Sequence, residues 1–111
     1  MALDDDVREA LEDLVAEHGT TLVYSRDDHS FQFEGYISRQ APVTVETESG
    51  GYTEVMGVDI LTPTASLSEV EPQQGDRIEH GEHIYEVQPV LGQKTFRIIS
   101  PSMTRIHTKL I

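Results

Sequence analysis

The residues with the clearest potential for chemistry lie in the run Glu79-His80-Gly81-Glu82-His83, which brings two imidazoles and two carboxylates together. Both groups are common metal ligands. Two histidines one helical turn apart would share a face of a helix, but these two flank a glycine that is typical of a tight turn. Side chains at such a turn usually point to solvent, so the run predicts a hairpin turn and no metal site.

Other kinds of catalysis lack a recognisable set of residues. The serines stand in turn contexts without the Gly-x-Ser-x-Gly pattern of a nucleophile, and the chain has no cysteine. Carboxylates are abundant, but their abundance alone identifies no acid-base pair. Gly50-Gly51 lacks the Lys-Ser/Thr that follows a phosphate-binding loop. The sequence therefore predicts no catalytic residue and no cofactor, and the protein is not expected to be an enzyme.

The overall charge argues against tight binding to nucleic acid. The chain carries 20 acidic against 8 Lys and Arg residues, a formal net charge of −12. Binding to a phosphate backbone requires clustered basic groups that release counterions. The simplest interpretation of the acidity is a well-solvated surface.

A basic cluster near the C-terminus contrasts with this acidity, and it consists of Arg97, Arg105, His107 and Lys109. Together with an acidic N-terminal segment, it suggests that copies dock head to tail through contacts between subunits or with a partner. An equally good alternative is that these charges only decorate exposed strand faces.

The length of 111 residues suits a single domain spanning residues 1–111. No apolar run approaches the roughly 20 residues needed to cross a bilayer, and the N-terminus does not resemble a signal peptide. We therefore expect no membrane association and synthesis in a cytoplasm.

One amphipathic helix is predicted at about residues 4–18. Val7, Leu11, Leu14 and Val15 recur at helical spacing, acidic residues occupy the first turn, and Gly19 lies just beyond the end. The helix should pack against one face or one opening of the remaining domain.

The rest of the chain, about residues 20–110, has the pattern of short β-strands punctuated by Gly and Pro. The expected strand segments are 20–26, 31–38, 43–48, 52–63, 77–90 with a turn at Gly81, 94–100 and 103–111. The resulting fold class is β-dominated α+β, a small antiparallel β-barrel or sandwich with one N-terminal amphipathic helix. The predicted core is Val7, Leu11, Leu14, Leu22, Phe31, Phe33, Ile60, Ile78, Tyr85, Val87 and Ile98.

A long excursion is expected at about residues 40–52. Gln40-Ala41-Pro42 opens it and Ser49-Gly50-Gly51 follows the run VTVETE, so we expect a long loop that contains a strand with a flexible tip.

The region from Gly57 onward resembles the small head-tail joining proteins of long-tailed bacteriophages, the lambda-type head completion or tail attachment proteins. The resemblance is carried by Val58-Asp59-Ile60, by Pro63 to Leu67, by Gly75-Asp76-Arg77-Ile78 with Gly81, and by Tyr85-Glu86-Val87. Many relatives end soon after the strand that here contains Phe96-Arg97-Ile98, whereas this chain continues through RIHTKLI.

The resemblance implies a structural protein of the virion neck, made in the bacterial host cytoplasm, that joins the DNA-filled head to the tail. Its expected partners are a portal or connector/adaptor ring, tail terminator or tail tube proteins, and copies of itself in a ring, expected as a hexamer. DNA would pass through without tight binding. The excursion, with Glu46, Glu48, Gly50, Gly51 and Glu54, resembles a loop projected toward a partner or the channel.

The acidity then gains a possible role. A negative channel lining repels the phosphates of sliding DNA, so we hypothesise that some of Glu46, Glu48, Glu54 and Asp59 face the channel.

Two other interpretations stay open. One is a different neck or tail component, such as an adaptor or tail terminator. The other is a generic β-barrel module that binds a peptide or small ligand, for which an acidic groove would be the sign.

Overall fold

The computed structural model of the chain describes residues 9–10, 13–67, 70–90 and 94–111. These residues are mostly β-structure, as the sequence predicts. The elements are β1 (Thr20–Arg26), β2 (His29–Ile37), β3 (Ala41–Glu46), β4 (Tyr52–Pro63), the 3-10 helix η1 (Thr64–Leu67), β5 (Arg77–His80), β6 (His83–Val87), β7 (Phe96–Ser100) and β8 (Met103–Leu110).

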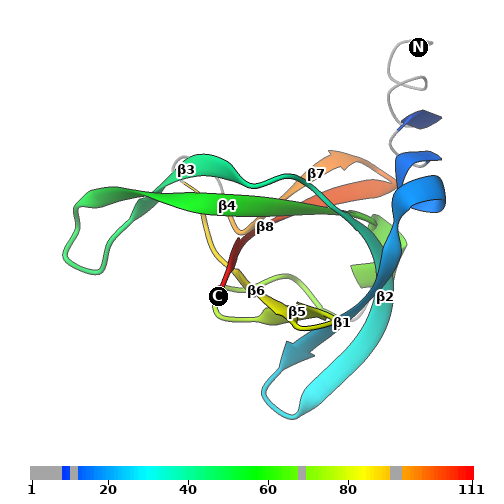
Figure 1. The fold of residues 1–111 in the computed structure, drawn as a ribbon, viewed down its shortest axis with the longest axis horizontal. Coiled ribbons are helices and arrows are strands. Elements are labelled where there is room, and N and C mark those ends of the chain that lie inside the picture. Colours follow the sequence, from blue (N-terminus) through cyan, green and yellow to red (C-terminus); the bar gives the residue numbers. More distant parts are fainter. Residues whose placement is uncertain (1–8, 11–12, 68–69, 91–93) are drawn as a thin grey trace.

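A closed antiparallel barrel forms the centre of the molecule. The strands pair in the order β4-β2-β1-β5-β6-β8, and β8 pairs back with β4 so that the sheet closes on itself. In that closing pair Ile60 lies opposite Ile106. Figure 1 shows β8 running along the inner part of β4. The expected fold class, a β-dominated barrel with one short helix, is confirmed.

The barrel interior is filled by alternate residues of its strands, as expected for a sheet with one buried face. The main buried cluster is Leu22, Tyr24, Phe33, Val58, Ile60, Ile78, Tyr85, Val87 and Ile106. Phe31 is partly buried and packs against this cluster. Leu14 is also partly buried and packs against a second cluster, which consists of Val15, Leu61 and Met103. Val7 and Leu11 lie outside the described residues.

Ile98 was wrongly placed in the core. It is 59% exposed, because β7 pairs only with β8 at the end of the strand order and flanks the barrel instead of contributing to it. The neighbouring Ile99, on the other face of β7, is the residue that packs partly buried against the cluster of Val15, Leu61 and Met103.

Two short hairpins have the turns that their sequences predict. Asp27, in the turn between β1 and β2, has a φ of 52°, and Gly81, between β5 and β6, has a φ of 60°. Both values suit the two-residue turns whose twist matches that of the strands. His80 and His83 are paired strand ends beside that second turn. Among the described residues, no group of three or more His, Asp or Glu is placed to hold a metal.

The N-terminal segment is helical at residues 9–10 and 13–18, and the remaining predicted helical residues lie outside the described ones. Val15 packs with Leu61 and Met103 on the outside of the barrel. Gly19 ends the helix with an N–H bond to the Val15 carbonyl at 2.8 Å. A Cβ at Gly19 would lie 2.2 Å from that carbonyl oxygen, so only glycine fits there. No helix in the described part of the chain is long and apolar enough to span a membrane.

The C-terminal extension is β8, which lies between β4 and β6 and closes the barrel. Its side chains are buried on both faces at Ile106, His107 and Thr108. The segment that seemed to be an addition is therefore part of the core structure.

The excursion at 40–52 is more regular than the expected long loop. Residues of β3 pair with the first half of β4 from Ala41 opposite Gly57 to Glu46 opposite Tyr52. Residues 47–51 form the turn, in which the Thr47 N–H donates to the Gly51 carbonyl at 2.8 Å. We call residues 41–56 the arm. Figure 1 shows it reaching away from the barrel as a two-stranded ribbon.

Candidate functional site

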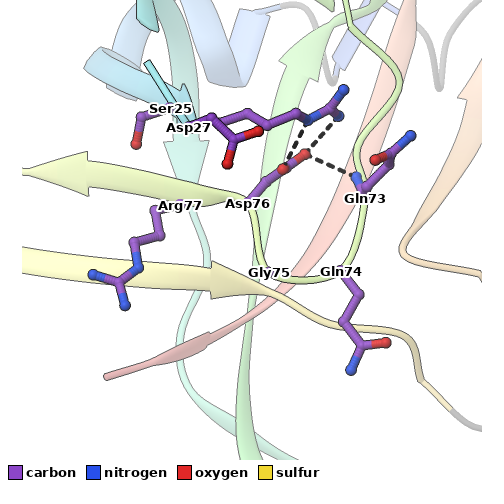
Figure 2. A pocket seen from close by; sticks show the side chains of 8 residues that line it. Ser25, Asp27, Gln73, Gln74, Gly75, Asp76 and Arg77 are labelled. Atoms are coloured by element: carbon purple, nitrogen blue, oxygen red, sulfur yellow. Dashed lines mark hydrogen bonds and ion pairs between the residues drawn. The ribbon is translucent and has the colours of Figure 1, made fainter. Parts of the chain in front are cut away.

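The most elaborate polar cluster of the described residues surrounds the buried side chain of Asp76, beside the loop that leads into β5 (Figure 2). Its carboxylate accepts hydrogen bonds from the Tyr24 hydroxyl at 2.5 Å and from the Gln73 N–H at 3.0 Å. The Arg26 guanidinium donates to both carboxylate oxygens, at 2.9 and 2.7 Å. Arg26 also donates to the Glu71 carbonyl at 2.7 Å, so it ties the loop to β1.

The charges in this cluster stabilise one another. Burial by itself raises the pKa of Asp76, but hydrogen bonds from Arg26, Tyr24 and the Gln73 N–H outweigh it and hold that pKa below its usual value. Burial and the bond to Asp76 raise the pKa of the Tyr24 phenol, so it stays protonated and donates. The bond to Asp76 likewise raises the pKa of Arg26.

The cluster acts as a structural clamp that holds the loop before β5 to β1. The Asp76 carboxylate already accepts four hydrogen bonds, which is about its full capacity. The open hollow of about 410 Å³ beside it is lined by polar loop residues, and Figure 2 shows Gln74 and Arg77 directed away from the carboxylate. Gly75 precedes Asp76 with a φ of 94°, which favours glycine.

This clamp explains the Gly-Asp part of the motif, which the sequence alone could not interpret. Gly75 provides the turn, Asp76 receives the bonds from β1, and Tyr85 and Val87 of the same motif lie in the core. The signal that could have revealed the cluster is the pairing of Gly-Asp with Tyr-x-Arg in an earlier strand, which places an aromatic hydroxyl and a cation on one face.

The residues proposed from the sequence as a partner or channel loop are all on the arm. Glu46, Glu48 and Glu54 are exposed, and Gly50 turns the tip with a φ of 87°. Gly51 donates its N–H to the Thr47 hydroxyl at 3.1 Å. The arm therefore presents only negative charge.

Two large apolar side chains are also exposed on the arm. Tyr52 is 64% exposed and Met56 49% exposed. The strand register places both on the face that carries Glu46 and Glu54. An isolated two-stranded ribbon is only marginally stable in water, so an arm with exposed apolar residues has the character of a docking element.

Asp59 does not belong with the acidic arm. It lies in the part of β4 that forms the barrel, where its carboxylate contacts the His107 Nδ1 at 2.9 Å and the Arg105 guanidinium at 3.4 Å. Its charge is compensated within the chain, which weakens the hypothesis that it lines a channel.

The basic residues of the C-terminal region are brought onto neighbouring strands but have different surroundings. Arg105 and the buried His107 contact Asp59, and Lys109 lies 3.6 Å from Glu86. Arg97 is exposed on β7, directly opposite Arg105 in the register. Arg97 is therefore the member of the cluster most open to another molecule.

The whole chain also matches a known protein family. A comparison with curated proteins gave no match. A family model described as phage head-tail joining protein matches residues 1–111, which is the full length. The chain belongs to the phage head-tail joining protein family and serves as a structural assembly protein of the phage neck, where it acts between head and tail components.

Proposed function

We propose that copies of this protein form a ring in the neck of the virion, expected as a hexamer, after synthesis in the cytoplasm of the bacterial host. The ring would bind a portal or connector/adaptor ring on the head side and tail terminator or tail tube proteins on the tail side. The protein would act without catalysis and without a cofactor. The observation that carries the proposal is the projecting arm. It exposes apolar side chains, and all its charged side chains are acidic.

The charge of the arm suits a neck through which DNA must move. Glu46, Glu48 and Glu54 would repel phosphate wherever the arm approaches the channel, so that duplex DNA slides without sticking. The tip residues Gly50 and Gly51 allow the turn to adapt to a partner. Of the basic residues predicted to make contacts between subunits, Arg97 would be the one available, because Arg105, His107 and Lys109 contact Asp59 and Glu86 of their own chain.

The other open interpretations gain no support from particular residues. A ligand-binding module would bind through free polar groups, but in the most elaborate polar cluster of the described residues the Asp76 carboxylate is occupied by Tyr24, Arg26 and Gln73. An adaptor or tail terminator would share the barrel, so only its place in the particle distinguishes it.

The test is electron microscopy of particles made by the parent phage after deletion of this gene. DNA-filled heads beside complete free tails would support the joining role. Normal joined particles would overturn it, and tails of abnormal length would instead identify a tail terminator. Complementation with the wild-type gene should restore joined particles.

A further inference from the structure

The strand order leaves one open edge at each end. Within the described residues, β3 pairs only with β4 and β7 pairs only with β8, so these are the terminal strands of the order β3-β4-β2-β1-β5-β6-β8-β7. An open edge exposes unpaired N–H and C=O groups that another strand can complete. Figure 1 shows the arm bearing β3 extending from one side of the barrel and β7 lying on the barrel itself.

The hydrogen bonding within the arm shows which groups β3 has free. The Thr47 N–H donates to the Gly51 carbonyl, and the register then makes Val45 and Thr53 the next hydrogen-bonded pair. Alternation turns the N–H groups of Thr44 and Glu46 outward to the open edge. Pro42 occupies the preceding outward position, where its missing N–H breaks no bond of the arm.

The same argument applies to β7. The His107 N–H donates to the Thr95 carbonyl at 2.8 Å, which makes Arg97 and Arg105 the next hydrogen-bonded pair. The N–H and C=O groups of Phe96 and Ile98 therefore point to the open edge. Each edge thus offers two N–H groups at the same spacing of two residues.

The side chains at the two edges are also complementary. Ile98 is 59% exposed and borders an apolar groove of about 220 Å³ that Leu67, Val70 and Phe96 help to line. The arm carries the exposed Tyr52 and Met56. The charges are opposite as well, because the arm bears only Glu46, Glu48 and Glu54, whereas Lys94 and Arg97 are exposed at β7.

We propose that β3 of one copy adds in antiparallel fashion to the open edge of β7 in the next copy, so that the arms link the subunits head to tail. One register uses both N–H groups of each strand, with Thr44 opposite Ile98 and Glu46 opposite Phe96. It places the arm face with Tyr52 and Met56 on the same face of the extended sheet as Phe96 and Ile98, which line the apolar groove. A contact between two different edges is heterologous, and such a contact forms a ring when the rotation between successive copies closes. The inference rests on the proposed ring, and it names the surfaces that hold the ring together.

Cross-linking tests this register directly, because the chain has no cysteine. The register makes Val45 and Arg97 a directly opposed pair without hydrogen bonds, about 4.5 Å apart between Cα atoms, a distance that permits a disulfide. Mild oxidation of particles carrying both Val45→Cys and Arg97→Cys should yield a ladder of multimers on non-reducing gels. Each single variant, and Val45→Cys with Gln32→Cys on β2, should yield no ladder. Absence of the ladder in joined particles, or a cross-link to a different virion protein, would overturn the inference.

A second pair of variants tests the backbone contact without new cysteines. Thr44→Pro removes an outward N–H but no bond within the arm, so isolated protein should melt near Thr44→Ala while losing incorporation into particles. Thr44→Ala keeps the N–H and should complement a gene deletion. Equal complementation by both variants would overturn the strand addition even if the joining role holds. If the wild-type protein is absent from the neck, the proposed function itself is wrong.

Discussion

At the scale of single residues, the hydrogen bonds and the ion pair of Asp76 hold the loop before β5 in place. Asp76, 4% exposed, binds Tyr24 and Arg26 of β1 and the backbone of Gln73. Hydrogen bonds between charged partners in a buried setting are stronger than neutral ones. The cluster therefore determines where the loop before β5 crosses the barrel end.

The first prediction concerns this clamp. Asp76→Asn keeps the size of the side chain but leaves the partly buried Arg26 without its counter-charge, so the free energy of unfolding should fall by about 2–4 kcal/mol. Urea unfolding followed by circular dichroism measures the change. The control Asp28→Asn, at an exposed turn position, should change stability by less than about 0.5 kcal/mol. Equal effects of the two variants would contradict the clamp.

The second prediction is a pH dependence. The pKa of Asp76 is lower in the folded than in the unfolded chain, so its contribution is complete above the unfolded value of about 4. That contribution is lost as the pH falls through the lower folded value. The stability difference between wild type and Asp76→Asn should therefore narrow from about pH 6 to about pH 3. Urea unfolding across this range measures it, and a constant difference would show that the Asp76 charge is not involved.

At the scale of secondary-structure elements, the strands divide into a closed barrel and two additions, the arm and β7. Barrel strands bury alternate residues against the opposite wall, as Val87 shows with 0% exposure. In β7, Ile99 packs partly buried against the cluster of Val15, Leu61 and Met103, whereas the adjacent Ile98 is exposed. Two apolar neighbours in one strand thus contribute differently to stability, because they lie on opposite faces of the sheet.

The third prediction compares these two strands. Val87→Asp buries a charge without a partner, which costs several kcal/mol and is enough to unfold a marginally stable domain. Ile98→Asp places the same group in solvent and should leave the melting temperature of the isolated protein nearly unchanged. Thermal unfolding by circular dichroism separates the two variants. A folded Val87→Asp protein would contradict the observed strand phase.

At the scale of the whole molecule, charge is unevenly distributed between the arm and the remaining surface. The net charge of −12 includes three exposed glutamates on the arm with no basic residue among positions 41–56. The barrel compensates several of its acids internally, as Asp59 with Arg105 and Asp76 with Arg26 show. The arm is therefore a part of the surface whose charge is exclusively negative.

The fourth prediction follows from that distribution. Replacing Glu46, Glu48 and Glu54 by Lys should slow DNA ejection, because a positive arm near the channel would hold phosphate. Light scattering during triggered ejection from purified particles measures the rate. The control replaces the exposed barrel residues Asp28, Glu79 and Glu82 by Lys. If the arm variant and the control eject at the wild-type rate, the arm does not line the channel.

Local features were readable from the sequence because their causes are local. Alternating apolar residues identify strand segments, and turn residues such as Gly81 identify hairpins through the backbone conformations they allow. The motif around Gly75-Asp76 indicated the family, which the full-length match confirms. The net charge, which is a property of composition, predicts that DNA is not a tight ligand, and this stays a prediction.

The remaining features were decided by contacts between residues far apart in the chain. β8 closes the barrel only because Ile106 meets Ile60, 46 residues earlier. The Asp76 clamp joins residues 50 and 52 positions apart, and its partners have no periodic relation in sequence. Whether a strand is in the wall, like β6, or outside it, like β7, depends on its neighbours on both sides. The sequence by itself thus determined the strands, the turns and the charge, whereas only the tertiary structure decided which strands close the barrel and which edges stay open, because pairing depends on long-range register.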